Sequence, residues 1–228
     1  KAFDNAGNIT TSDSVSVTLD RTAPILTITD PSAAGIVNSA KVITFTNDSD
    51  SSSNVGECSI DNSIWVACTS ETTTLNSITG FGALGDTSFT LYLRDADIAG
   101  NVGTTQVALV KDSTSPTVTA KSPSVNAVSV DPSANVEVTF NEAMNATTLT
   151  STTITLKKGG VAVDTVVTYD ADKMMATINP VSILDNNSTY TVNVTTGAKD
   201  ATGNGATVTT WSFTTSASYS MALSTGWN

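Results

Sequence analysis

The sequence predicts an all-β protein made of antiparallel β-sandwiches in tandem. Three observations lead to this prediction. Short runs alternate apolar and polar residues, turn-forming residues separate these runs, and two short phrases recur at intervals of roughly one hundred residues. No stretch shows a sustained helical periodicity.

Period-two alternation places apolar side chains on one face of several expected strands. These strands are 14–20 (SVSVTLD), 88–95 (SFTLYLRD), 135–140 (NVEVTF) and 188–194 (STYTVNV). Gly159-Gly160 lies between two further runs of strand-forming residues and predicts a tight hairpin turn. Such short strands with turns between them are typical of sandwiches.

The first repeated phrase, D-x-T-[AS]-P, marks the domain boundaries. It occurs at Asp20–Pro24 and at Asp112–Pro116, and its proline cannot continue the ladder of the strand before it. We therefore expect residues 1–21 to be the C-terminal strand region of an incomplete domain, as part of a longer protein. Two complete domains follow at 22–114 and 115–216, each of about the size of an immunoglobulin-like sandwich. A tail, 217–228, has no role that the sequence reveals.

The second phrase, D-x-x-G-N, follows three expected strands. It spans Asp4–Asn8, Asp97–Asn101 and Asp200–Asn204. In a seven-strand sandwich the loop after strand six lies at the end where the chain comes in, and the chain leaves from the opposite end. With strand six at 88–94 and strand seven at 104–111, the loop at 97–101 should face the linker that carries Asp20.

The same reasoning brings Asp112 to the N-terminal end of the next domain, beside the loops after its second and sixth strands. Each junction thereby gathers carboxylate and amide oxygens, which calcium prefers, and these carboxylates would repel one another without a cation. The candidate ligands are Asp20, Asp95, Asp97, Asn101, Asp112, Asn141, Glu142, Asp200 and Asn204. The alternative is a plain turn, because Asp bonds nearby amides while Gly and Asn accept positive φ.

Cys58 and Cys68 are the only cysteines and enclose an Asp61-Asn62-Ser63 turn. We expect a disulfide across a hairpin, which stabilises by about 2–3 kcal/mol in the chain-entropy model. Two thiols in a reducing compartment are the alternative. Trp65 lies within this hairpin and is expected to pack there or in the core.

The composition argues against several classes of partner and of catalytic site. The net charge of −11 makes nucleic acid and anionic membrane surfaces poor partners, and no apolar run is long enough to insert into a membrane. With no histidine, the chain holds no Ser-His-Asp or Cys-His arrangement, and it carries no phosphate-binding glycine motif. We therefore expect no enzyme. The acidic residues are 17 Asp and 4 Glu. This excess of Asp suits turns and loops that bind a cation through oxygen ligands.

The order of several phrases resembles known families. CSIDNSIWVACTS, FTLYLRDADIAGNV and VKDSTSP, within residues 58–116, resemble the bacterial Ig-like repeats of large surface proteins and adhesins. SPTVTAKSPS, VEVTFNEAMN, the KDATGN loop and WSFTT resemble the S-layer-type bacterial Ig-like domain. The resemblance implies tandem immunoglobulin-like sandwiches outside the cell, with structural calcium at their junctions.

We accordingly expect a spacer segment of a large extracellular surface protein, in an adhesin stalk or an S-layer-like element. Its partners would be the flanking domains of the same polypeptide and neighbouring copies in a surface lattice or filament. The alternatives are accessory modules of a secreted hydrolase, or a filament subunit that donates residues 1–21 as a strand to a neighbour. A domain that binds a glycan or a protein also remains open, although only 6% of the residues are aromatic.

Overall fold

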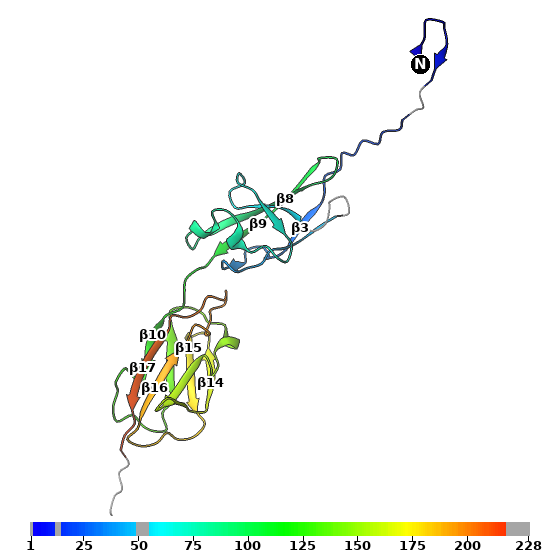
Figure 1. The fold of residues 1–228 in the computed structure, drawn as a ribbon. Coiled ribbons are helices and arrows are strands. Elements are labelled where there is room, and N and C mark those ends of the chain that lie inside the picture. The colour runs from blue at the N-terminus through cyan, green and yellow to red at the C-terminus, as the bar shows by residue number, and fades with distance from the viewer. Residues whose placement is uncertain (1, 12–14, 49–54, 218–228) are drawn as a thin grey trace, which may run out of the picture.

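The chain folds into two β-sandwiches that follow one another along the sequence (Figure 1). The structure is a computed structural model that describes residues 2–11, 15–48 and 55–217. Within these ranges the only helices are single 3-10 turns, namely η1 (Leu75–Ser77), η2 (Phe81–Ala83) and η3 (Ala146–Thr148). None of the described helices has the length and apolar character needed to cross a membrane.

The first sandwich packs a two-stranded sheet against a five-stranded one. The small sheet pairs β3 (Leu26–Asp30) with β5 (Thr44–Asn47). The large sheet has the order β4-β9-β8-β6-β7, with β4 (Ile36–Val37), β6 (Val55–Ser59), β7 (Val66–Thr69), β8 (Ser88–Ala96) and β9 (Val102–Lys111). Phe45, Leu91 and Leu109 are among the buried residues between the sheets.

The second sandwich has two four-stranded sheets. One has the order β10-β11-β15-β14, with β10 (Val118–Ser122), β11 (Val136–Phe140), β14 (Thr165–Asp170) and β15 (Met175–Pro180). The other has the order β13-β12-β16-β17, with β12 (Ile154–Lys158), β13 (Val161–Ala162), β16 (Thr189–Val194) and β17 (Thr209–Thr214). Its core is separate from the first and includes Val138, Trp211 and Phe213.

The predicted alternation is confirmed in three of the four strands. β8, β11 and β16 bury every second side chain, because one face of each strand packs on a core while the other meets solvent. The expected hairpin forms between β12 and β13, where Gly159 and Gly160 have φ of 57° and 85°. Strands six and seven, β8 and β9, are longer than expected and pair from Ser88↔Val110 to Ala96↔Val102.

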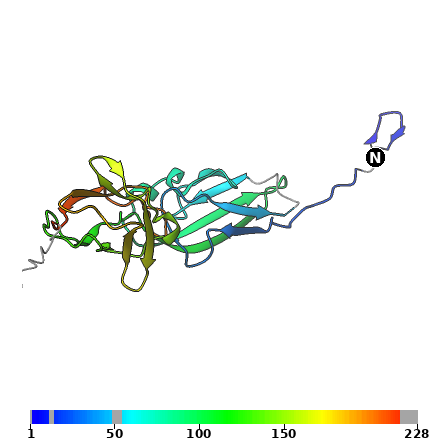
Figure 2. The ribbon, with the colours of Figure 1, turned by 90° about the horizontal axis from the view of Figure 1, so that it is seen from below.

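The expected strand at 14–20 is wrong for the residues that the structure describes there. Residues 15–20 are in no strand, and Val15, Val17 and Leu19 are 84%, 83% and 67% exposed. The segment has a strand pattern, but within the described chain no sheet lies beside it. The preceding hairpin of β1 (Ala2–Phe3) and β2 (Ile9–Thr10) lies apart from both sandwiches (Figures 1 and 2).

Candidate metal centre at the domain junction

The loop at Asp200–Asn204 is built around one carboxylate. Asp200 is buried, and its Oδ1 accepts hydrogen bonds from the backbone N–H groups of Thr202 (2.8 Å), Gly203 (2.6 Å) and Asn204 (2.8 Å). Gly203 supplies a φ of 100°, which a residue with a side chain rarely adopts. The plain-turn interpretation of D-x-x-G-N therefore describes the local structure of this loop.

The loop also holds the linker between the two sandwiches. Asn204 Nδ2 donates to Asp200 Oδ2 at 2.8 Å and to the backbone oxygen of Asp112 at 3.3 Å. Thr202 Oγ1 donates to Asp112 Oδ2, also at 3.3 Å. We call these contacts of Asn204 and Thr202 with Asp112 the linker clamp. It fixes Asp112, the first residue of the linker, to the second sandwich.

The first sandwich holds the same linker from the other side. Asp86 Oδ1 accepts from the backbone N–H of Ser113 at 2.7 Å and from its hydroxyl, and Asp86 Oδ2 accepts from Thr114 Oγ1. These hydrogen bonds lower the pKa of Asp86, with those from the Ser113 and Thr114 hydroxyls as the largest cause. Asp112 Oδ1 closes an Asx turn by accepting from Thr114 N–H at 3.0 Å.

Three acids from different parts of the chain meet at this junction. Asp112 ends the first sandwich, Glu142 follows β11, and Asp200 follows β16; one carboxylate oxygen from each lies within 4.8 Å of the other two. Burial raises the pKa of Glu142, and the charges of Asp112 and Asp200 raise it further. The junction is therefore a site where negative charge is concentrated and only partly compensated by the protein.

The donor set suits a hard cation such as calcium, which is bound by oxygen atoms in irregular geometry. Asp112, Glu142 and Asp200 each have a carboxylate oxygen that such an ion would use, with further ligands from backbone carbonyls and water. Asp200 Oδ1 already accepts three backbone hydrogen bonds. Asn204 presents its amide nitrogen to its oxygen partners, so its place here is in the linker clamp.

Asn141 lies at the edge of the cluster. Its Oδ1 accepts from Thr117 N–H at 2.6 Å, and its Nδ2 donates to Glu142 Oε1 at 3.3 Å. Asn141 thus ties the start of the second sandwich to the loop after β11 and orients Glu142. Its side chain therefore positions an acid of the cluster, while its own oxygen is already hydrogen-bonded to Thr117.

The first junction repeats the asparagine contact of the linker clamp, but not its threonine contact or the acid cluster. Asn101 Nδ2 donates to Asp97 Oδ2 at 2.8 Å and to the backbone oxygen of Asp20 at 3.4 Å, and the bonds from Asn101 lower the pKa of Asp97. Asp95 lies in β8, where its Oδ2 accepts from Asn47 Nδ2 at 3.2 Å. In the described part of the chain, only the second junction brings three acids within metal-binding distance.

Two residues of the junction were not predicted from the sequence. Thr202 occupies a variable position of D-x-x-G-N, and its hydroxyl could have been suspected from its place next to two predicted ligands. Asp86 belongs to no repeated phrase, so the sequence carries no signal for its contact with the linker. Its role depends on where the turn before β8 lies in space.

The predicted disulfide is confirmed. Cys58 and Cys68 are joined across the β6–β7 hairpin, with a Cα–Cα distance of 5.5 Å, and both are buried in the first core. Trp65, expected in the core or hairpin, lies half-buried on the outer side of this hairpin, under the guanidinium of Arg94. A disulfide is typical of an oxidising compartment, outside the cell or in its envelope.

A comparison with protein families identifies the second sandwich. Residues 112–215 match the family model of the bacterial Ig-like domain. This part of the chain is similar to the bacterial Ig-like domain. The match begins at Asp112, so the linker aspartate belongs to the domain whose loop clamps it. The bacterial Ig-like domain thus includes all three acids of the cluster.

No curated protein matches the sequence significantly. Among solved structures, the N-terminal part of the bacterial S-layer protein SbsC is 23% identical over 45% of this chain and 24% of that one, with a TM-score of 0.36. The copper resistance protein PcoC of Escherichia coli is 18% identical over 45% of this chain and 99% of that one, with a TM-score of 0.38. The fibronectin(III)-like modules of Clostridium thermocellum CbhA are 12% identical over 85% and 95%, with a TM-score of 0.40. The chain spans about a quarter of the S-layer chain that it matches.

Proposed function

We propose that the chain is a non-catalytic spacer of a cell-surface protein, in an adhesin stalk or an S-layer-like element, whose domain junction is stiffened by calcium. One observation carries this proposal: the linker at Asp112–Thr114 is held by hydrogen bonds from both sandwiches, next to a cluster of three acids. A linker held from both sides favours a fixed orientation of the two domains over a flexible hinge.

Calcium would complete this arrangement through charge. Asp112 comes from the linker, while Glu142 and Asp200 come from loops of the bacterial Ig-like domain. An ion bound by all three would join the end of β9 to two loops of the next domain, and would offset the repulsion that raises the pKa of Glu142. The flanking domains of the same polypeptide are the partners that this role requires.

The test is a thermal melt of the chain in excess calcium and in excess EDTA, at matched ionic strength. A ligand that binds only the folded state at 100 times its Kd adds about 2.7 kcal/mol, so a rise of several degrees is expected. The matched variant is Glu142→Gln, because Glu142 holds no turn and its one side-chain hydrogen bond comes from Asn141.

Two results separate the parts of the proposal. Loss of the calcium response in Glu142→Gln supports an ion at this cluster, whereas superimposable wild-type melts with calcium and EDTA contradict it. Small-angle scattering then tests the spacer role by itself. A single extended arrangement of the two domains supports a rod, and a broad distribution of interdomain distances contradicts it.

A further inference from the structure

The outer face of the large sheet in the first sandwich carries an unusual set of side chains. Tyr92 and Arg94 of β8 face away from the core, since their neighbours Leu91 and Leu93 are buried. The strand register places Tyr92 opposite Gln106 of β9, with Ser59 of β6 on its other side. Arg94 is likewise flanked by Thr104 and Glu57.

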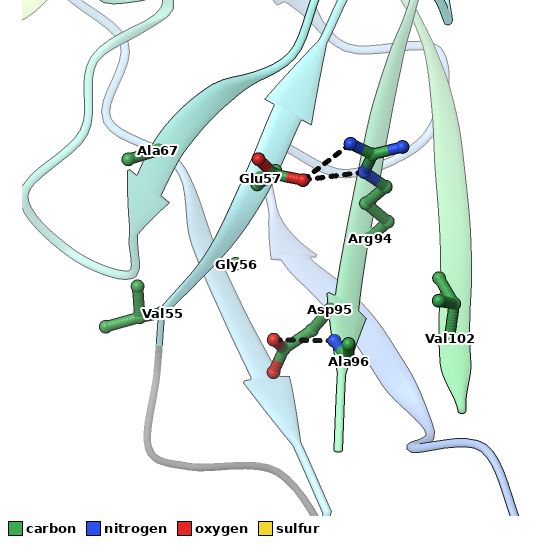
Figure 3. Close-up of a pocket in the computed structure, with 8 residues that line it drawn as sticks. All are labelled: Val55, Gly56, Glu57, Ala67, Arg94, Asp95, Ala96 and Val102. Carbon is green, nitrogen blue, oxygen red and sulfur yellow. Dashed lines mark hydrogen bonds and ion pairs between the residues drawn. The ribbon is translucent and has the colours of Figure 1, made fainter. Parts of the chain in front are cut away.

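Two hollows lie on this face. One, of about 270 Å³, is bordered by the side chains of Asn62, Trp65, Tyr92, Thr104 and Gln106. The other, of about 580 Å³, has the ion pair of Glu57 and Arg94 in its wall (Figure 3). The smaller hollow is near the lower end of the size range of small-molecule sites, so it suits a compact unit such as one sugar ring.

The polar groups around the smaller hollow are available to a ligand. Within the described chain, the side chains of Asn62, Tyr92, Thr104 and Gln106 and the indole N–H of Trp65 make no hydrogen bond to the protein. The amide and hydroxyl groups both donate and accept hydrogen bonds, whereas the indole N–H only donates.

The second sandwich provides an internal comparison, because β16 and β17 are its counterparts of β8 and β9. There the outward polar side chains bond one another across the strands. The pairs are Thr189–Thr214 at 3.1 Å, Thr191–Ser212 at 3.0 Å and Thr210–Asn193 at 2.8 Å. The outward polar side chains thus bond one another in the second sandwich, whereas those around the smaller hollow of the first sandwich make no such bonds.

The aromatic ring beside the hollow is held in place. The guanidinium of Arg94 lies 4.2 Å from the centre of the Trp65 ring, and its Nε and Nη2 each contact Glu57 Oε2 at 2.7 Å. Glu57 fixes Arg94, and Arg94 in turn fixes the indole, so little ordering is required on binding. Glu57 also compensates the charge of Arg94, and none of the residues that line the smaller hollow carries a charge.

We propose that this hollow binds a neutral saccharide. An aromatic side chain next to uncharged amide and hydroxyl groups matches a sugar, which has apolar C–H faces and a rim of hydroxyls. An extended peptide would need a free strand edge, but β8 is paired with β6 on one side and β9 on the other at this position. Anionic sugars are disfavoured by the net charge of −11.

The test is an NMR titration of the whole chain with three neutral probes: the hexasaccharides of β-1,4-glucose, α-1,4-glucose and β-1,4-N-acetylglucosamine. At about 10 mM probe, tenfold above a Kd of about 1 mM, at least one should shift the Trp65 indole N–H signal to saturation. The indole of Trp211 is the internal control, because it donates to Pro123 O at 3.0 Å in the other domain and should not shift.

Two variants complete the test. Gln106→Ala changes an exposed side chain without hydrogen bonds, so the fold is retained, and affinity should fall about fivefold through the loss of one hydrogen bond. Trp65→Ala should abolish binding while a thermal melt confirms folding. The proposal is overturned if no neutral probe shifts Trp65, if both folded variants bind as the wild type does, or if only a sulfated hexasaccharide binds.

Discussion

The side-chain amide of Asn204 donates a hydrogen bond to the backbone oxygen of Asp112 across the domain junction, at 3.3 Å. Asn101 makes the same contact with Asp20 at 3.4 Å, so the relationship occurs at both linkers. In each case the asparagine is also held by the aspartate that begins its own loop. The linker and the loop therefore form one structural unit that recurs along the chain.

Replacing Asn204 should loosen the junction without unfolding either domain. Asn204→Ala removes the side-chain bonds to Asp112 O and Asp200 Oδ2, while the bond from the backbone N–H of residue 204 to Asp200 stays. The net loss in stability should be about 1–2 kcal/mol. Small-angle scattering should show a broader distribution of interdomain distances than in wild type. Asn179→Ala, at an exposed position of β15, is the matched control and should leave the distribution unchanged.

Glu142 should destabilise the calcium-free protein at neutral pH. Its pKa is raised in the folded state, so ionising it costs folding free energy: the penalty is absent below the unfolded pKa and complete above the folded one. Glu142→Gln should therefore melt higher than wild type in EDTA at about pH 7, and the difference should vanish as the pH falls to about 3. In excess calcium the order should reverse at neutral pH. A variant that melts lower than wild type in EDTA would contradict this account.

Gly103 is required by the close approach of the chain at the start of the first sandwich. A Cβ at this position would collide with the backbone oxygen of Pro24 and lie 2.9 Å from its carbonyl carbon. Gly103→Ala should lower the free energy of unfolding of this domain by about 1–3 kcal/mol, measured in urea. Gly85→Ala is the control, since nothing lies within 4 Å of its new methyl group, and equal effects of the two would refute the steric explanation.

The disulfide should stabilise only the first sandwich. Replacing both Cys58 and Cys68 with Ser opens a short loop within one hairpin, and should cost about 2–3 kcal/mol in the chain-entropy model. Urea unfolding, monitored by NMR, should show the first domain of the variant unfolding at a lower urea concentration than in wild type. The signals of Trp211, in the second core, should report an unchanged midpoint. A shift of both domains would instead indicate that their stabilities are coupled.

The parts of this structure that the sequence predicts are those fixed by local chemistry or by the number of strands. The D-x-x-G-N loop is such a case, because Asp200 bonds amides that follow it within four residues. The alternation of Tyr190, Val192 and Val194 is another, since one face of β16 must be buried. The meeting of Asp112 with Asp200 was also predictable, because strand count alone sets the end of the sandwich at which each lies.

The structural features that the sequence does not predict depend on residues that are distant in the sequence and adjacent in space. β8 extends to Ala96 because β9 pairs with it from Val102 onward, which no pattern within either strand specifies. Val15, Val17 and Leu19 have the pattern of a strand but no partner in the described chain. The stack of Arg94 on Trp65 requires the register of three strands, so the polar hollow beside it could not be foreseen.

The repeated asparagine contact has a geometric consequence for longer arrays. If the same loop holds every linker in such a protein by this hydrogen bond, each domain is rotated by the same angle and displaced by the same distance relative to the one before. A chain of identical joints of this kind winds into a superhelix. Its pitch would be set by the contact of Asn204 with Asp112 and its equivalents, and a change at these small joints would be multiplied along the whole length of the molecule.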